Sequence, residues 1–298
     1  MSPEKQLAER LPSVVADRLR SQAADLPTTV IQPTHGWAPV NLRDLAQFRE
    51  VLYFLVWSEL KVRYKQTVLG AAWAIIHPVA IMLVFTIFFG LVVRVPTGDI
   101  PYPVFVFSGI VVWTYFSGAL NQSSNSLVQY ERLITKVYFP RLLIPVASII
   151  AGLVDFAIAF MVLIGMTIFF GFMPTAAVFA LPLLMLLAAT IALAVSLWLS
   201  ALNVQYRDVK LLIPVLVQVW FFATPIIYPS SLVPDRWHTL YELVNPMVGV
   251  VNGFRWALLG AGEPPGMILV VSALMALVLL VSGLYYFRRM ERIFADVV

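Results

Sequence analysis

The 298-residue chain contains no cysteine and little charge. Without cysteine it cannot form a disulfide framework, a thiolate metal site or a cysteine nucleophile. Charged residues make up only 12% of the sequence, whereas 60% of the residues are hydrophobic. This balance excludes an ordinary globular domain and is typical of a polytopic membrane protein.

Two catalytic motifs are also missing. The sequence contains neither a Gly-x-x-x-x-Gly-Lys-Ser/Thr phosphate-binding loop nor a zinc-binding His-Glu-x-x-His motif. We therefore expect that the chain does not hydrolyse ATP or peptides by itself, and we assign it no catalytic residue, metal or cofactor. Its net charge of +4 comes mainly from basic residues beside hydrophobic runs, so we predict no nucleic-acid binding.

The longest uncharged stretch lies between Lys65 and Arg94. Its apolar part, Thr67–Val93, exceeds the roughly 20 residues that a helix needs to cross the hydrocarbon core of a bilayer. Lys61, Arg63 and Lys65 precede it. Because lysine and arginine accumulate on the cytoplasmic side, this end of the span is predicted to be cytoplasmic.

Hydrophobic segments of this kind recur and predict an all-α membrane protein with six transmembrane helices. The predicted spans are Thr67–Val93, Val104–Leu120, Leu142–Phe170, Ala176–Leu202, Leu211–Tyr228 and Gly266–Phe287. An even number of spans places both ends of the chain on one side. Of the 20 basic residues, only Arg94, Arg236 and Arg255 fall in segments predicted outside, so both termini, including the tail 288–298, are predicted to be cytoplasmic.

Two segments precede the spans. Residues 1–40 are polar and interrupted by prolines such as Pro12 and Pro27, which predicts a loosely ordered cytoplasmic arm. Residues 41–66 begin with Asn41, a favourable helix cap, and then alternate apolar and charged residues at helical spacing. This second segment is predicted to be an amphipathic helix in the cytoplasmic membrane interface.

The segment 229–265 lies outside in this topology. Its second half, Leu243–Gly262, is nearly as apolar as a span but contains Pro246 and Arg255. A seventh span here would put the basic C-terminal tail outside, against the charge rule. We predict instead two short re-entrant helices, which must pack within protein or line a cavity.

Asp155 is the only ionisable carboxylate in a predicted span. Charged residues inside a membrane are costly and are often functional. A proton-coupled carrier, however, usually needs several such groups, and Asp155 has no basic partner on its own helix. A structural role is favoured, with the carboxyl either protonated or bonded to a neighbouring helix, while a proton-driven carrier is the alternative.

The loop Asn121–Arg141, predicted inside, has an amphipathic pattern. One helical face would carry the apolar residues Leu127, Tyr130, Leu133, Ile134 and Val137, and the other the charged residues Glu131, Arg132 and Lys136. Two interpretations fit this pattern. The loop forms either a second interfacial helix or a short helix that docks a cytoplasmic partner through charge and apolar contact.

Aromatic residues gather near the predicted outer ends of spans. The set comprises Phe85, Phe88, Phe89, Trp113, Tyr115, Phe116, Trp220, Phe221, Phe222 and Tyr228. An interfacial aromatic belt accounts for part of it. Because the apolar faces of sugar rings stack on aromatic side chains, an inward-facing subset would line a passage for a glycan.

Three stretches carry a family resemblance in the same order along the chain. They are LYFLVWSELKVRYKQTVLGAAWAIIHPVAIMLVFTIFFG (Leu52–Gly90), VYFPRLLIPVASIIAGLVDF (Val137–Phe156) and LNVQYRDVKLLIPVLVQVWFFATPIIYP (Leu202–Pro229). They resemble the permease subunits of bacterial ABC exporters for polysaccharides, and the likeness runs roughly from Thr29 to the C-terminus. O-antigen exporters are most similar, with teichoic-acid, capsule and galactan exporters close behind.

This resemblance implies a permease domain at residues 67–298 and a homodimer in the bacterial inner membrane. It also implies two copies of a separate ATP-binding cassette subunit, which hold the ATP and Mg, and a substrate glycan on an undecaprenyl pyrophosphate carrier. The coupling helix of the family maps to about Leu127–Phe139, with Leu127, Tyr130, Glu131, Arg132 and Lys136 as contact residues. Arg63 and Lys65 would lie where the pyrophosphate approaches.

Three alternatives are kept. The first is an exporter of the same architecture for drugs or small lipids. The second is the proton-driven carrier that would use Asp155. The third is a membrane-bound glycosyltransferase or lipid phosphatase, for which the sequence offers no cluster of acidic, histidine or arginine residues at one interface.

Overall fold

The structure is a computed structural model that describes residues 46–65, 69–173, 175–206, 208–261, 264, 266–291 and 294. Every regular element within these ranges is helical, which confirms the all-α prediction. The predicted N-terminal arm (1–40), the first residues of the predicted interface helix, Arg207 and most of the C-terminal tail lie outside the described residues.

Five segments of the described chain are long and apolar enough to cross a membrane. They are Gly70–Val92, which combines η1 (Gly70–Ala72), α5 (Trp73–Phe85) and the π-helical η2 (Thr86–Val92); α6 (Tyr102–Gln129); α8 (Leu143–Phe169); Ala176–Gln205, which combines η3 (Ala176–Ala180) and α9 (Leu181–Gln205); and α13 (Met267–Glu291). These segments correspond to the first, second, third, fourth and sixth predicted spans.

The fifth predicted span, Leu211–Tyr228, is shorter in the structure. Its counterpart α10 (Val209–Phe222) is apolar but has only 14 residues, fewer than the roughly 20 needed to span a bilayer on their own. The helix ends here because Pro225 disfavours helical backbone at the preceding Thr224. The six-span count therefore stays a prediction.

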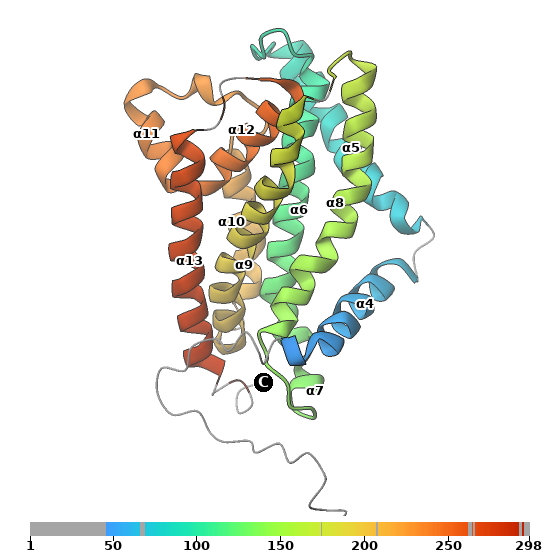
Figure 1. Cartoon of the computed structure of the whole chain (residues 1–298), viewed down its shortest axis with the longest axis vertical. Coiled ribbons are helices and arrows are strands. Elements are labelled where there is room, and N and C mark those ends of the chain that lie inside the picture. Colours follow the sequence, from blue (N-terminus) through green and yellow to red (C-terminus); the bar gives the residue numbers. More distant parts are fainter. Residues whose placement is uncertain are drawn as a thin grey trace, which may run out of the picture. The chain divides into compact units, whose positions relative to one another are not determined.

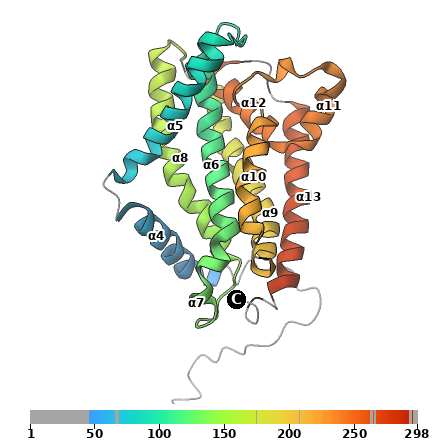
Figure 2. The same ribbon diagram turned by 180° about the vertical axis from the view of Figure 1, so that it is seen from behind.

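Helix α6 is the most buried of the five candidate spans. It packs against α5, α8, α9, α10 and α12, and Figures 1 and 2 show it running through the middle of the helices. Small polar residues allow this close approach. Ser123 Oγ lies 2.8 Å from Ser196 Oγ of α9 and 3.1 Å from the Pro145 carbonyl of α8, so one side chain joins three helices.

Helix α4 (Arg49–Lys65) forms most of the described part of the predicted interface helix. It packs obliquely on α8, beside the spans (Figures 1 and 2). Leu55 and Glu59 are buried, whereas Tyr53, Phe54 and Trp57 are exposed. Such an exposed aromatic face suits a membrane interface, and the interfacial location stays a prediction.

Two short helices, α11 (Asp235–Val244) and α12 (Pro246–Leu259), occupy the segment predicted to be re-entrant. They follow α10 through η4 (Ser230–Leu232). Asn245 caps α12 by accepting the Met247 amide hydrogen, and its Nδ2 donates to the Ala223 carbonyl at the end of α10. The capping residue thus fixes α12 to α10, while insertion of these helices into the outer leaflet stays a prediction.

The turn after α10 is also held by a buried arginine. Arg255 of α12 is only 3% exposed, and its guanidinium donates to the carbonyls of Pro225 and Ile226. Residues predicted to lie in an outer loop therefore include a cation enclosed by protein. The guanidinium charge is stabilised because Nη1 and Nη2 each donate a hydrogen bond to one of these backbone carbonyl oxygens.

Candidate functional site

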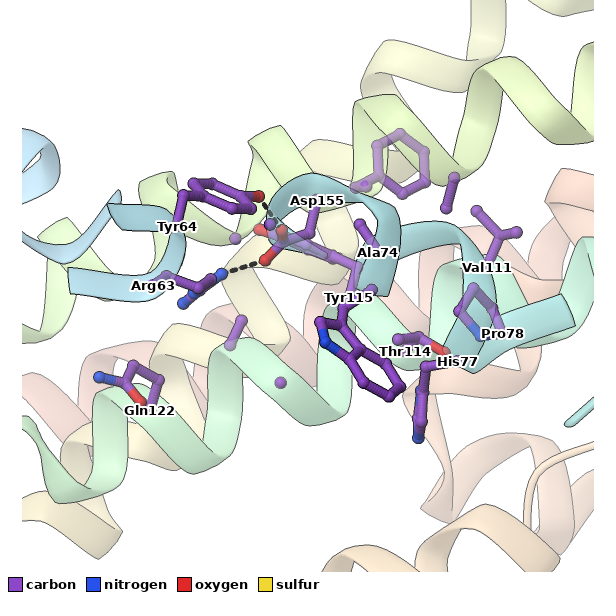
Figure 3. Close-up of a pocket in the computed structure, with 17 residues that line it drawn as sticks. Arg63, Tyr64, Ala74, His77, Pro78, Val111, Thr114, Tyr115, Gln122 and Asp155 are labelled. Atoms are coloured by element: carbon purple, nitrogen blue, oxygen red, sulfur yellow. Dashed lines mark hydrogen bonds and ion pairs between the residues drawn. The ribbon is translucent and has the colours of Figure 1, made fainter. Parts of the chain in front are cut away.

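A cavity of about 510 Å³ lies among helices α4, α5, α6 and α8 (Figure 3). Most of its lining is apolar and comes from α5, α6 and α8. Its polar groups include those of Arg63, Tyr64, His77, Thr114, Gln122 and Asp155. This volume falls in the range of small-molecule sites, which combine apolar walls with a few polar anchors.

Asp155 is the acidic group of this cavity. Arg63 Nη1 forms an ion pair with its Oδ2, and the Tyr64 hydroxyl donates a hydrogen bond to its Oδ1. Both donors come from the end of α4 and point toward Asp155 on α8 (Figure 3). Asp155 is thus bonded to a neighbouring helix, which was one of the two structural roles predicted from the sequence. Arg63, predicted to meet the pyrophosphate, already has an anionic partner.

A second polar contact joins α4 to α8 one turn before Arg63. Glu59 is only 5% exposed, and Ser148 Oγ donates to its Oε1 at 2.5 Å. Burial raises the pKa of the Glu59 carboxyl, and the Ser148 hydrogen bond and the Arg63 charge offset part of this increase. No described residue hydrogen-bonds its Oε2. Helix α4 is therefore attached to α8 at a buried level and at a cavity-facing level.

Small residues create the space between these helices. A methyl group added at Gly152 would meet the Tyr115 ring at 3.4 Å, whereas one added at Gly118 would meet nothing within 4 Å. The cavity therefore exists partly because α6 carries no side chain at Gly118. A larger residue there would occupy the cavity without displacing its walls.

Seven of the ten predicted aromatics form one connected network across α5, η2, α6 and α10. Phe85 stacks on Phe221 with ring centroids 5.7 Å apart, and Phe221 meets Trp113 at 5.7 Å. The other members are Phe89, Phe222, Phe116 and Trp220, and Trp220 is joined to the rest through Phe116. The network links the first predicted span directly to the shortened fifth one.

The remaining three channel candidates lie apart from these ring contacts. Phe88 is exposed on η2, and Tyr115 lines the cavity with its ring against Phe156. Tyr228 donates a hydrogen bond from its hydroxyl to the Phe222 carbonyl. The structure therefore divides the predicted set between the network, an exposed helix face, the cavity and the turn after α10.

The segment predicted to couple to a partner is not one continuous helix. Helix α6 extends to Gln129, Tyr130 caps it, and α7 (Glu131–Ile134) is a single turn. Leu127 is 0% exposed and packs inside the protein, so it cannot contribute to an exposed docking face. Tyr130 is half-buried.

The charged members of that segment are all on the surface. Glu131, Arg132 and Lys136 are exposed. Beside them lies an apolar groove of about 290 Å³, between the first turns of α4 and a segment formed by α7 and the residues that follow it. The groove is lined by Glu50, Val51, Phe54, Leu133, Val137 and Phe139. Apolar contact area and exposed charge of both signs are therefore adjacent.

Metal binding has no candidate in the described part of the chain, where no three His, Asp or Glu side chains come together. Arg63 and Asp155 were each predicted from the sequence, whereas their pairing and the roles of Glu59 and Tyr64 were not. The available signal was spacing: Glu59 and Arg63 are one turn apart on α4, and Ser148 and Asp155 are two turns apart on α8.

The sequence profile of the ABC-2 type transporter family matches residues 50–259, from α4 to the end of α12. The chain belongs to the ABC-2 type transporter family. The matched range includes the cavity, the aromatic network and the α7 segment. The resemblance to ABC exporter permeases expected from the sequence is therefore confirmed.

Several permeases of polysaccharide export systems are similar to this ABC-2 chain. The O-antigen export system permease protein RfbA of Myxococcus xanthus is 32% identical over 254 residues, which cover 84% of this chain and 96% of that protein. RfbA of Klebsiella pneumoniae is 26% identical over 255 residues, or 85% and 97% of the two chains. The polysialic acid transport protein KpsM of Escherichia coli is 25% identical over 238 residues, or 78% and 90%.

Proposed function

We propose that this ABC-2 permease is the transmembrane subunit of an ATP-driven exporter for undecaprenyl-pyrophosphate-linked polysaccharide. Its substrate is an O-antigen-like glycan, moved from the cytoplasm across the bacterial inner membrane. The observation that carries this proposal is the 32% identity to an O-antigen export permease over 96% of that protein's length. The lower identity to a polysialic acid transporter makes a capsule-type polymer the second candidate.

The energy comes from a separate subunit. The sequence has no phosphate-binding loop, so ATP and Mg bind to two copies of an ATP-binding cassette partner. Each copy docks on the α7 segment of one permease in a homodimer, with both permease termini in the cytoplasm. The exposed Glu131, Arg132 and Lys136 set the docking register, and the neighbouring groove supplies apolar contact.

Transport then follows from differential binding. ATP draws the two partner copies together, and their movement pushes on the two α7 segments, because the ATP-bound partner favours one arrangement of the dimer over the other. A passage opens between the two permeases along the first and fifth spans. The stack of Phe85 on Phe221 supports this role because it couples α5 to α10.

The carrier pyrophosphate enters at the end of α4. Arg63 and Lys65 lie in the last turn of that helix, at the cavity among α4, α5, α6 and α8. The aromatic network gives sugar rings apolar faces on which to slide. Phe222 of the network and Phe88, which lies outside it, are exposed and open to such contact.

Depletion of the chain in its host, followed by analysis of inner-membrane lipid-linked glycans, tests this function. A full-length polymer trapped on its carrier inside the cell is the expected result, and its repeat would identify the substrate. Intact surface glycans without accumulation would refute polysaccharide export and favour small amphiphiles as substrates. Stimulation of the partner's ATPase by such amphiphiles would then be measured.

A further inference from the structure

We propose that Asp155 is a resident substitute for phosphate. In this inference its carboxylate occupies an anion site formed by Arg63 and Tyr64 until a phosphate carried by a lipid displaces it. The inference deepens the proposed function and rests on it, because the exporter would supply the lipid-borne phosphate. In this proposal Asp155 controls which lipids bind in the cavity.

The donors of this site match phosphate as well as carboxylate. Arg63 offers a planar guanidinium that binds either anion through two parallel hydrogen bonds. Tyr64 adds a hydroxyl donor from the next position of α4, and the two donors reach different oxygens of Asp155. Two donors that converge on one anion from the end of a helix form a recognition site, whichever anion fills it.

The ion pair is exchangeable because α4 does not depend on it for attachment. The side chains of Arg63 and Asp155 are 32% and 29% exposed, and both line the cavity. Both groups can therefore be reached from the cavity, where an entering anion can contact Arg63. Leu55 and Glu59, by contrast, are buried and hold α4 independently. Release of Asp155 therefore frees the anion site while α4 stays on α8.

The lining of the cavity indicates a lipid rather than a free anion. One corner carries the Arg63–Asp155 pair, whereas the walls are largely apolar side chains of α5, α6 and α8. A soluble phosphate would use only the charged corner. An amphiphile with a phosphate head uses both parts, and the polar residues Gln122, Thr114 and His77 also line the cavity (Figure 3).

Exchange of the two anions also keeps the charge balanced. In the resting state Asp155 neutralises Arg63, so the cavity holds no uncompensated cation at the membrane. A neutral lipid gains nothing by entering, because it cannot replace the carboxylate on Arg63. An anionic head group can, and Asp155 thus raises the selectivity of the site for phosphate at the cost of affinity.

Binding of radiolabelled farnesyl pyrophosphate to the purified full-length chain tests the proposal. Dodecyl maltoside micelles are suitable because they contain no phosphate. Asp155→Asn should tighten binding about threefold to tenfold, since the competing charge is lost, and Arg63→Gln should weaken it about tenfold. The double variant should bind like Arg63→Gln alone, because competition by Asp155 requires Arg63. Tyr64→Phe should weaken binding by a smaller factor.

Ser148→Ala is the matched control, because it removes the other polar contact between α4 and α8 without altering the cavity. Its affinity should stay within about twofold of wild type. Weaker binding by Asp155→Asn would overturn the proposal, since it would show that the carboxylate only positions α4. A gain from Asp155→Asn that persists in the Arg63→Gln background would overturn it as well.

Two competitors identify the source of the anion. Unlabelled farnesyl pyrophosphate should compete, whereas inorganic pyrophosphate and farnesol should each compete at least about tenfold less well, because each offers half of the recognised chemistry. Equal competition by inorganic pyrophosphate would overturn the lipid assignment, and equal competition by farnesol would overturn the phosphate assignment. These results are independent of the glycan analysis after depletion, so failure of the exporter function is recognised separately.

Discussion

The Arg255 guanidinium lies 3.7 Å from the centre of the Phe105 ring and donates through Nη2 to the Ile226 carbonyl at 2.6 Å. One side chain thereby joins α12 to the start of α6 and to the turn after α10. Because the arginine is enclosed by protein, its hydrogen bonds are not replaced by water when it is removed.

Arg255→Ala should therefore destabilise the protein by about 3 kcal/mol, because buried carbonyl acceptors lose a charged donor. Arg255→Lys should recover only part of this loss, since an ammonium cannot bridge the same acceptors. Thermal unfolding in detergent, followed by loss of monodisperse protein, measures both. Arg236→Ala is the control: Arg236 is exposed, and equal losses at both positions would contradict the assigned role.

Glu59 gives the protein a predictable response to pH. Burial raises the pKa of its carboxyl above 4.5, so the charged form is disfavoured in the folded state relative to the unfolded chain. As pH rises from 4.5 through the raised pKa, this group therefore costs stability. Glu59→Gln should raise the thermal midpoint at neutral pH, and the gain should vanish at pH 4.5 and below.

The comparison for this prediction is Glu131→Gln, which neutralises an exposed carboxylate. It should show no comparable gain at neutral pH. A Glu59→Gln variant less stable than wild type at neutral pH would show that the ionised carboxylate is needed for the contact with Ser148.

Filling the cavity should block its use without unfolding the protein. A leucine at Gly118 enters open space, so Gly118→Leu should fold normally and reduce farnesyl pyrophosphate binding at least about tenfold. Gly165→Leu is matched to it, because Gly165 also has nothing within 4 Å but does not line the cavity. Equal binding by the two variants would place the ligand elsewhere.

The docking register on α7 can be tested by charge reversal. Glu131→Arg combined with Arg132→Glu should lower binding of the ATP-binding partner at least about tenfold, because each residue then faces a like charge. Co-purification of the two subunits and the ATPase rate of the complex are the measurements. Retention of both would refute the docking role, and Arg236→Glu, on α11, is the control for a general charge effect.

Hydropathy alone was sufficient to locate five of the candidate spans, because an uncharged apolar run of sufficient length has few other stable environments. It failed where polar residues are buried. The segment after Leu120 is rich in serine and asparagine and was assigned to a loop, yet α6 continues through it to Gln129. Ser123 and Ser124 are buried there against neighbouring helices, and a hydropathy scale does not predict the burial of polar residues.

The candidate site was predictable in its members but not in its pairing. Arg63 and Asp155 stood out as a basic helix end and a lone intramembrane acid, yet 92 positions separate them in the chain. Their contact depends on how α4 packs on α8, where Leu55 and Glu59 are the buried residues of α4. No local pattern in the sequence encodes it.

The central position of α6 also has an evolutionary consequence. A helix that packs on five others transmits any change in side-chain volume to all of them, because protein interiors are close-packed. Homologues that diverge toward other polymers should therefore keep the side-chain volumes of α6 and vary at the exposed surfaces of α5 and α10. In a phylogeny of such exporters, the sequence of α6 would then vary least, and the exposed positions of α5 and α10 would vary with the polymer that is transported.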